Sequence, residues 1–595
     1  MNYYMTKEEI LAILNKVGKV DLSIPESKKQ AVIANPLLQD YLKMIADCAE
    51  QYRGTPIPVL PYSSFKLFHE TGDREKAQSD PVTGYFPRRS RLHSFSKLAW
   101  LYGREEDISE MEDALWAVCD EYTWSLPAHL KRGEGENAFV DKLENGDYMV
   151  DLFAAETADA LAEISFHMGD KLAPIIRKRI AHLLEERTFS QVLQNTFGWM
   201  SNKGNWATVC AGSVGMAAIY AIEDNAHLAE VLARILPACD TFLQGFSKDG
   251  ACLEGIGYWG YGFSFFTHLA DTLLQRTKGE IDLFDDPRVP KVAAFQQKCF
   301  FKGGRTVSFS DGSSHGKYVR NGLNCYLYRK YADTIQPPTA ELYAYDGHSW
   351  SGSFRTLLWV EDVPDVGDAY GCYPLEDAQW YLCSAANGVG IAAKGGHNAE
   401  PHNHNDVGSF QIFMNGEEFF SDLGSGEYTR QYFAADTRYD HLVNGSHGHS
   451  VPLVDGCVQK AGEEYAACNV TVDETGIAMD IAPAYGLEFL PSLQRVVKFD
   501  RAAGTTTLTD TFELVGEHEI RERFMVFGEI TAEPGCIAVK MGEDVMTLSY
   551  DPALFTVEVA EEVFSNHEAQ PTTVKKLDLV TRAQGTFTAA FIVTP

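Results

Sequence analysis

The feature that constrains the fold most is a change in the spacing of apolar residues along the chain. Up to about residue 340, apolar residues recur every three or four positions, as on one face of a helix. After about residue 375 they form short runs rich in β-branched and aromatic residues. Turn pairs such as Asn415-Gly416, Asp455-Gly456 and Ala503-Gly504 separate these runs. A helical part followed by a β part predicts two domains with a cleft between them.

The helical part contains many predicted helices joined by short loops rich in Gly, Pro and Asn. The predicted helices include 108–122, 151–168, 172–186, 207–222, 228–242 and 263–276. We find no sequence repeat of fixed length, which disfavours a regular solenoid and leaves a helical bundle or an (α/α) toroid. We place this domain at residues 1–375 and count 341–375 as its connection to the next domain.

The remaining residues, 376–595, are predicted to form an antiparallel β-sandwich. Predicted strands cover 380–382, 389–393, 410–413, 495–499, 505–509, 524–527 and 587–593. The predicted fold class is therefore α+β and multidomain, with an N-terminal (α/α) toroid followed by a C-terminal antiparallel β-sandwich.

Composition narrows the classes of partner. A net charge of −32 over 595 residues argues against nucleic acid, which needs a basic surface. No apolar stretch is long enough for a membrane span. The first residues lack a signal-peptide pattern, and Thr6 with Glu9 predicts a helix capping box instead. Twelve scattered cysteines without CxxC pairs are typical of reduced thiols, so we expect a cytoplasmic protein.

Polar residues are concentrated most strongly in residues 396–410. This segment holds three histidines, three asparagines and Asp406, and it leads directly into the apolar run 410–413. Imidazoles crowded beside a rigid strand indicate a metal or substrate site, although single Asn and His residues are common in loops.

A second cluster, Arg88, Arg89 and Arg91, interleaves with aromatic residues in 85–93. In so acidic a chain it predicts either a wall that contacts an anionic ligand or a solvated face that balances nearby acids.

Five motifs occur in the order found in one known family. They are residues 151–158, the pair Asn205-Trp206, residues 249–259, the run containing His402 and His404, and residues 449–456. In this order the chain resembles the heparinase II/III-type polysaccharide lyases, which join an α/α toroid to a β-sandwich. The resemblance implies β-elimination at a uronic acid. That reaction needs a neutralised carboxylate, a base for the α-proton and an acid for the leaving oxygen.

The resemblance also implies roles for individual residues. Asn205 matches the residue that neutralises the carboxylate, although its place before a predicted helix also suits an ordinary N-cap, and Asn202 is the alternative. Tyr258, expected in a loop, matches the residue that transfers the proton, with Tyr261 as the alternative.

His402 matches the catalytic histidine, as base or as a second neutraliser. Tyr439 matches a second tyrosine that some relatives use as the base; Tyr258 would then be the acid. Further residues expected to contact substrate are Arg88, Arg89, Arg91, Trp206, Trp259, Tyr261 and Arg438.

A metal site is expected at His404, Asp422 and His449. Separations of 18 residues, from 404 to 422, and of 27, from 422 to 449, suit neighbouring strands of one sheet. Two imidazoles and a carboxylate suit zinc. In an extended segment His404 points away from His402, which suits separate roles. The resemblance implies one zinc per chain with a structural role, and His447 is the competing ligand.

Two other functional classes are open. A glycoside hydrolase on the same scaffold needs two opposed carboxylates, for which Glu254 and Asp249 are candidates. A non-catalytic carbohydrate-binding protein keeps the fold without the chemistry. The expected partner is an acidic oligosaccharide or polysaccharide, with imported oligosaccharides favoured, and a homodimer is left open. The sequence does not separate glycosaminoglycans from alginate or other uronans.

Overall fold

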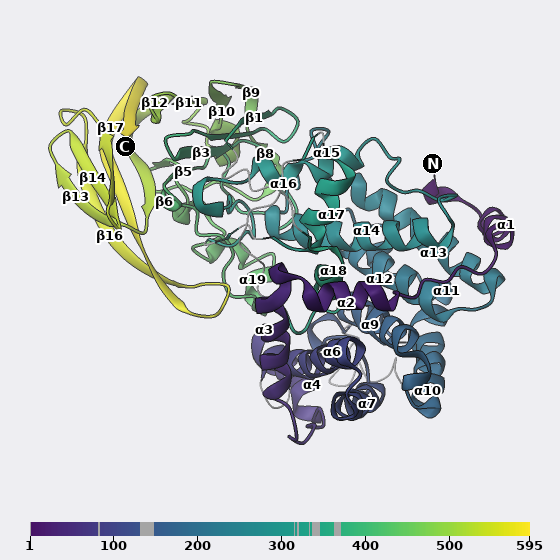
Figure 1. Cartoon of the computed structure of the whole chain (residues 1–595). Coiled ribbons are helices and arrows are strands. Elements are labelled where there is room, and N and C mark those ends of the chain that lie inside the picture. Colours follow the sequence, from purple (N-terminus) through teal and green to yellow (C-terminus); the bar gives the residue numbers. More distant parts are fainter. Residues whose placement is uncertain are drawn as a thin grey trace.

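The structure is a computed structural model. It describes residues 2–80, 84–130, 148–314, 316–317, 320–332, 334–335, 345–361 and 370–595. Residues 341–344 and 362–369 of the expected connection lie outside the described residues. Apart from two short helices, α19 (Arg430–Phe433) and α20 (Ala482–Tyr485), the α-helices precede the β-strands along the chain. The predicted order of an (α/α) toroid and an antiparallel β-sandwich is therefore confirmed (Figure 1).

The helical domain is built from helices of unequal length. They are α1 (Lys7–Val17), α2 (Glu26–Ala34), α3 (Gln39–Glu50), α4 (Tyr62–Thr71), α5 (Arg74–Ser79), α6 (Tyr85–Tyr102), α7 (Glu105–Cys119), α9 (Leu152–Met168), α10 (Pro174–Leu184), α11 (Ser190–Gln194), α12 (Trp206–Ala221), α13 (Asn225–Leu243), α14 (Ile256–Arg276), α15 (Val289–Ala293), α16 (Phe295–Lys298), α17 (Gly322–Lys330) and α18 (Ser351–Trp359).

The predicted starts of α1 and α9 carry capping groups in the structure. The Thr6–Glu9 capping box begins α1. The Asp151 side chain accepts a hydrogen bond from the backbone of Ala154 and so caps α9, which ends at Gly169. These ends form as predicted because the capping groups lie within four residues of the groups that they satisfy.

Helix α12 is the centre of the helical domain. It is apolar on all sides and packs against α9, α13 and α14. Gly212 allows the close approach of α14, because a β-carbon there would lie 2.7 Å from the carbonyl oxygen of Phe265. The start of this buried helix carries Asn205 and Trp206.

The β part contains two large antiparallel sheets. A five-stranded sheet has the order β1-β2-β3-β5-β6, and a ten-stranded sheet has the order β13-β14-β15-β17-β12-β11-β10-β9, with β16 beside β17 and β7 beside β12. A small sheet pairs β4 with β8. The strands are β1 (Cys372–Leu375), β2 (Trp380–Ser384), β3 (Val389–Lys394), β4 (His397–Asn398), β5 (Phe410–Met414), β6 (Glu417–Phe420), β7 (Leu453–Val454), β8 (Gly462–Ala466), β9 (Cys468–Asp473), β10 (Gly476–Asp480), β11 (Ser492–Asp500), β12 (Thr505–Val526), β13 (Glu529–Glu533), β14 (Cys536–Met541), β15 (Asp544–Ser549), β16 (Thr556–Ser565) and β17 (Pro571–Thr594).

The five-stranded sheet is a middle layer. On β2, Tyr381 and Cys383 belong to the core shared with the large sheet, whereas Trp380 and Leu382 belong to the core of the helical domain. Figure 1 shows β3 and β5 between the helices and the outer strands β13 and β16. Both faces of the sheet are therefore buried, which explains the continuous apolar runs at 380–382 and 389–393.

Two strand predictions needed correction. The separate strands predicted at 505–509 and 524–527 are the two ends of one strand, β12, and the last predicted strand is the end of β17. The register shift between Leu514 and Glu517 and the exposed residues beside it break the alternation of apolar residues, so the pattern reads as two strands. The Asn415-Gly416 turn joins β5 to β6 with positive φ at both residues, as predicted.

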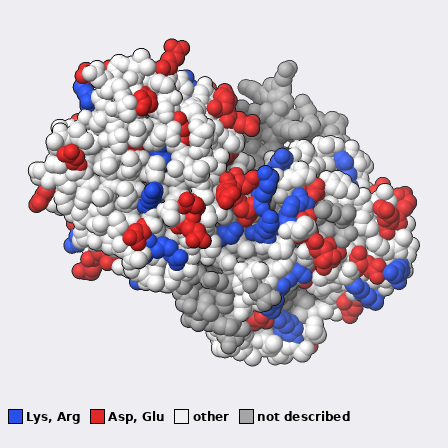
Figure 2. All heavy atoms as spheres, turned by 90° about the horizontal axis from the view of Figure 1, so that it is seen from above, with Lys and Arg blue, Asp and Glu red and all other residues white. Residues whose placement is uncertain are grey.

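Within the described part of the chain, no helix is both long and apolar enough to cross a membrane. On the face drawn in Figure 2, the described lysine and arginine side chains lie among aspartate and glutamate side chains rather than forming one continuous basic surface.

Candidate active site

A cleft of about 1220 Å³ lies between the helical domain and the loops of the β part. The helical domain contributes Asn205, Trp206, Tyr258 and Tyr261, and the β part contributes several further residues to the other wall. The contributing residues of the β part include His402, Asn403, Tyr428, Arg438 and Tyr439. All four residues expected to be catalytic therefore line one cavity.

Asn205 occupies the N-cap position of α12, but its side chain makes no capping hydrogen bond. The interpretation of Asn205 as an ordinary capping side chain is therefore wrong. Instead, its backbone N–H and its Nδ2 donate to Glu254 Oε2 at 3.2 and 3.3 Å. An amide nitrogen carries two N–H groups, so Glu254 orients the side chain and leaves one N–H for a ligand in the cleft.

Tyr258 lies in the first turn of α14, so its expected place in a loop is wrong. Its ring stacks on the imidazole of His402, with centroids 4.1 Å apart. Its hydroxyl is within hydrogen-bond distance of the Tyr428 hydroxyl, at 2.5 Å. Burial, and next the charge of Asp311, raise the pKa of Tyr258, so the group is a neutral phenol near pH 7.

Asp311 joins these groups, and sequence reasoning missed it. This buried carboxylate accepts hydrogen bonds from His402 Nδ1 at 2.6 Å, from His404 Nε2 at 3.0 Å and from the hydroxyl of Tyr428 at 3.0 Å. The Tyr432 hydroxyl also donates to it. Burial alone would raise the pKa of Asp311, but the hydrogen bonds from both histidines hold it well below its usual range.

The two histidines do not point in opposite directions. His402 has a positive φ of 54°, so the segment turns at this residue and is not extended. Both imidazoles consequently meet at Asp311, through its two carboxylate oxygens. The expectation of separate directions assumed a strand geometry that the chain does not adopt here.

Arg438 and Tyr439 follow on the same wall of the cleft, in a short turn of helix, Arg438–Asp440. Arg438 donates to the backbone oxygen of Asn403 through Nε and Nη2, at 3.1 and 2.9 Å. Asn403 Nδ2 in turn donates to the Tyr439 hydroxyl at 3.3 Å. Both residues therefore brace the loop that carries His402.

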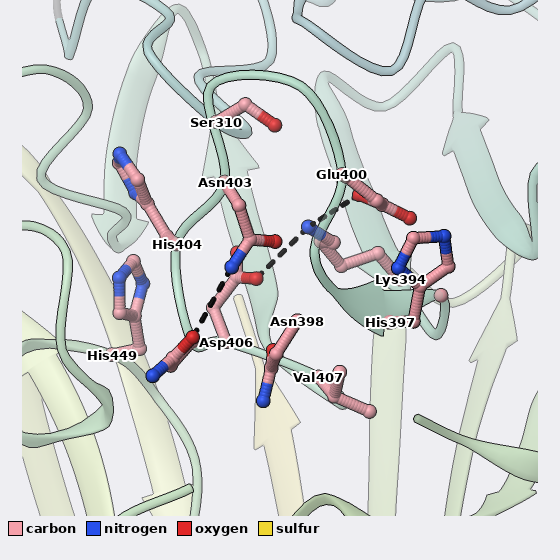
Figure 3. Close-up of polar contacts among 12 residues, drawn as sticks. Ser310, Lys394, His397, Asn398, Glu400, Asn403, His404, Asp406, Val407 and His449 are labelled. Atoms are coloured by element: carbon pink, nitrogen blue, oxygen red, sulfur yellow. Dashed lines mark hydrogen bonds and ion pairs between the residues drawn. The ribbon is translucent and has the colours of Figure 1, made fainter. Parts of the chain in front are cut away.

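A buried cluster behind the loop fits a metal ion. His404, Asp422 and His449 bring ligand atoms within 4.8 Å of one another (Figure 3 shows both histidines). His449 Nδ1 lies 3.3 Å from Asp422 Oδ2, yet His404 Nδ1, His449 Nδ1 and Asp422 Oδ2 all lack a hydrogen bond of normal geometry. Such atoms are costly to bury without a partner.

The second nitrogen of each histidine in this cluster has a partner. His404 Nε2 donates to Asp311, and His449 Nε2 donates to the backbone oxygen of Val443 at 2.9 Å. These bonds leave both Nδ1 lone pairs free for a cation, which is the usual arrangement around a metal-binding imidazole. The triad can therefore hold a metal, and His447 lies outside it.

A buried lysine anchors the other end of the His402 loop. Lys394, at the end of β3, contacts Asp406 Oδ1 at 2.9 Å and Glu400 Oε2 at 3.4 Å (Figure 3). All three side chains are buried. Burial opposes the charge on Lys394, but Asp406 and then Glu400 outweigh it and raise its pKa. The sequence did not predict these ion pairs, because a single lysine at the end of a strand is common and does not identify its partners.

The three arginines of α6 are not part of the cleft, so the interpretation as an anion-contacting wall is wrong. They do balance nearby acids, but as buried side chains and not on a solvated face. Arg88 and Arg89 are buried and pair with Glu121 at 2.8 and 2.7 Å. Arg91 pairs with Glu110 at 2.6 Å. None of the three is among the described residues that line the cleft. Their charges are neutralised by glutamates inside the helical domain, where burying an unpaired arginine would lower the stability of the fold.

Trp259 and Asp249 do not have the roles that the sequence predicted for them. Trp259 is buried in the helical core, and its Nε1 donates to the backbone oxygen of Val292 at 2.7 Å, so it does not contact the cleft. Asp249, considered for hydrolysis, accepts hydrogen bonds from the backbone of residues 377 and 378 and so anchors a loop. Glu254, its expected partner, does line the cleft.

The structure is similar over nearly its whole length to solved polysaccharide-lyase structures. A crystal structure of heparinase III has a TM-score of 0.60 at 12% identity, covering 98% of this chain and 92% of that one. The heparan sulfate lyase HepC from Pedobacter heparinus has a TM-score of 0.56 at 12% identity, covering 99% and 93%. The Streptomyces coelicolor chondroitin AC lyase, in complex with chondroitin sulphate, has a TM-score of 0.55 at 11% identity, covering 96% and 82%.

By sequence, no family model and no curated protein matches this chain. At these identities the structural likeness shows the fold alone: the chain has a polysaccharide-lyase fold.

Proposed function

We propose that this protein cleaves a uronic-acid-containing oligosaccharide or polysaccharide by β-elimination and leaves an unsaturated uronate end. The observation that carries the proposal is the meeting of Asn205, Tyr258 and His402 in one cleft. These residues come from distant parts of the chain, and together they supply the three groups that the elimination needs.

The first step removes the proton next to the sugar carboxylate. This proton is only weakly acidic while the carboxylate is ionised, so the Asn205 amide donates a hydrogen bond to the carboxylate and stabilises the developing charge. Glu254 holds the amide in place through the backbone and side chain of Asn205.

His402 is our first candidate for the base. Its Nδ1 donates to the ionised Asp311, which leaves the lone pair of Nε2 to accept the proton. Tyr439 lines the same cleft and is the second candidate.

Tyr258 is our candidate for the acid. It is a neutral phenol, because burial raises its pKa, and it can therefore give its proton to the glycosidic oxygen as the bond breaks. The hydroxyl of Tyr428 lies between Tyr258 and Asp311, which supports return of a proton to Tyr258 after each turnover.

We also propose that His404, Asp422 and His449 bind one zinc ion per chain. The donor set of two imidazoles and a carboxylate and their unpartnered atoms support this assignment. A bound cation would add positive charge behind the loop and stabilise its fold. His404 also bonds to Asp311, so this site supports the position of His402 without taking part in the chemistry.

Ultraviolet absorbance during digestion of a panel of uronate oligosaccharides tests the function. Elimination creates a carbon–carbon double bond conjugated to a carboxylate, so absorbance should rise. Tyr258→Phe should lower the rate by about 100-fold or more, because it removes the proton that the acid supplies. Tyr550→Phe is the matched control and should leave the rate unchanged, because Tyr550 directly follows β15 and is not among the residues that line the cleft.

Two outcomes would contradict the proposal. New reducing ends without a rise in absorbance would indicate a glycoside hydrolase. Binding of the oligosaccharides without any product would indicate a carbohydrate-binding protein.

A further inference from the structure

One arginine in the cleft, Arg74, uses little of its hydrogen-bonding capacity on the part of the chain that the structure describes. Arg74 begins α5 and lines the cleft together with Tyr258 and Tyr261. To the described residues its guanidinium makes one hydrogen bond, from Nη2 to His129 Nε2, at 2.6 Å. No carboxylate among the described residues lies within ion-pair distance of Arg74. A guanidinium carries five N–H donors, so four of them have no partner among the residues that the structure describes.

The single hydrogen bond is rigidly supported. His129 Nδ1 contacts Asp151 Oδ2 at 2.6 Å. The same carboxylate accepts from the backbone of Leu126 at 3.1 Å and from that of Ala154 at 2.7 Å, where it caps α9. Asp151 is therefore held at three points, and it fixes the direction of the His129 ring.

The hydrogen bonds also define which nitrogen of His129 carries the proton. Asp151 accepts a hydrogen bond from Nδ1, so the Nε2 lone pair faces Arg74 and accepts from it. The edge of the ring packs against Trp206, with centroids 4.8 Å apart. One edge of the Arg74 guanidinium thus bonds to His129, and its other N–H donors can bond to a ligand in the cleft.

The other arginines that line the cleft have donors engaged with backbone oxygens. Arg430 donates to the oxygens of residues 68 and 69 at 2.6 Å each, which ties the β part to α4. Arg438 donates to the oxygens of Asn403 and Tyr432. Arg74 differs from both because it bonds to the His129 imidazole, which in turn bonds to the Asp151 carboxylate. These two hydrogen bonds orient the Arg74 side chain and do not anchor a loop.

We propose that Arg74, oriented by His129 and Asp151, binds an oxyanion of the substrate, a carboxylate or a sulfate, at a position separate from Asn205. This inference rests on the proposed function and names a determinant of its substrate class. A guanidinium matches both oxyanions with paired N–H donors. The ligand also supplies the negative charge that Arg74 lacks in the free protein, which favours anionic over neutral sugars in a chain of strongly negative net charge.

Binding to a chain that does not turn over substrate separates this inference from the proposed function. The background is Tyr258→Phe, and the probes are glucuronate, glucose and inorganic sulfate, measured by ligand-observed magnetic resonance. Glucuronate should bind more tightly than glucose. Adding Arg74→Gln should weaken binding of the anionic probe by about tenfold or more, because it removes a charge-assisted hydrogen bond, and should leave glucose unchanged.

Further variants test the orientation and guard against misfolding. Arg74→Lys keeps the charge but loses the paired donors, so it should fall between the parent and Arg74→Gln. His129→Ala should weaken anion binding while Arg74 is still present, and a merely structural role would not reproduce the selective loss of anions. Lys66→Gln, an exposed cation on α4, is the charge-matched control.

The outcomes are distinct. A loss for sulfate alone identifies a sulfate site, and a loss for glucuronate alone identifies a carboxylate site. Equal affinity of the parent and both Arg74 variants for both anions would overturn the inference. Anion binding that depends on Arg74 in a protein that never forms a double bond would overturn the proposed function and leave this inference standing.

Discussion

Replacing Glu156 with glutamine should change how the stability of this protein depends on pH. Glu156 lies on α9, lines the cleft and accepts a hydrogen bond from the Tyr261 hydroxyl. Burial raises the pKa of Glu156 from 4.5 to about 7, although the bond from Tyr261 and the charge of His348 oppose the rise. The carboxyl is therefore still half protonated near neutral pH.

Glu156 lowers the free energy of unfolding as pH rises, because its pKa differs between the folded and unfolded chains. Below about pH 4.5 the carboxyl is protonated in both states, so it has no effect on the free energy of unfolding. Between pH 4.5 and 7 the unfolded chain releases the proton while the folded chain keeps it, so stability falls as pH rises. Above about pH 7 the loss is complete and constant.

The size of this stability change is set by the difference between the pKa values of Glu156 in the unfolded and folded chains, 4.5 and about 7. One pKa unit corresponds to about 1.4 kcal/mol, so the full difference amounts to about 3 kcal/mol. Part of the Glu156 side chain faces the cleft, where solvent weakens the effect. We therefore expect Glu156→Gln to gain about 2 kcal/mol relative to the parent between pH 4.5 and pH 8, since glutamine stays neutral and still accepts the bond from Tyr261.

Urea unfolding of both chains at pH 4.5, 6 and 8 measures this difference. Glu488→Gln, an exposed carboxylate on the loop before β11, is the control and should show no pH-dependent difference from the parent. A difference between Glu156→Gln and the parent that stays the same at all three pH values would refute the reasoning.

Three other predictions concern the site. Asn205→Ala should lower turnover by about 100-fold while the chain stays folded, because one hydrogen bond to the developing charge is lost; a near-normal rate would remove Asn205 from the mechanism. Lys394→Met should lower the free energy of unfolding by about 3–5 kcal/mol, because it leaves buried carboxylates without their cation. Adding Asp406→Asn should recover part of that loss, and equal stabilities of the single and double variants in urea would contradict the pairing. Freshly purified protein should carry about one zinc per chain by metal analysis, and chelation should lower Tm, since a ligand of the folded state stabilises it. His404→Ala should lower Tm to a similar value, and protein purified without chelator that contains no zinc would contradict the metal site.

The sequence by itself determined the order of the domains and several of the longer helices. Apolar spacing and capping groups act over a few residues, so the start of α9 at Asp151 and the turn at Asn415-Gly416 were readable locally. The order of motifs, through a family resemblance, also singled out Asn205, Tyr258 and His402, which the structure brings to one cleft.

The tertiary structure alone decided which side chains are partners. The arginines of α6 suited either an anion-contacting wall or a solvated face that balances acids, and the fold buries them against Glu121 and Glu110. Asp311 carried no recognisable motif, yet it bonds to His402, which is 91 residues further along the chain. A local pattern encodes the periodicity of one element, whereas the charge that a buried group meets depends on elements that only folding brings together.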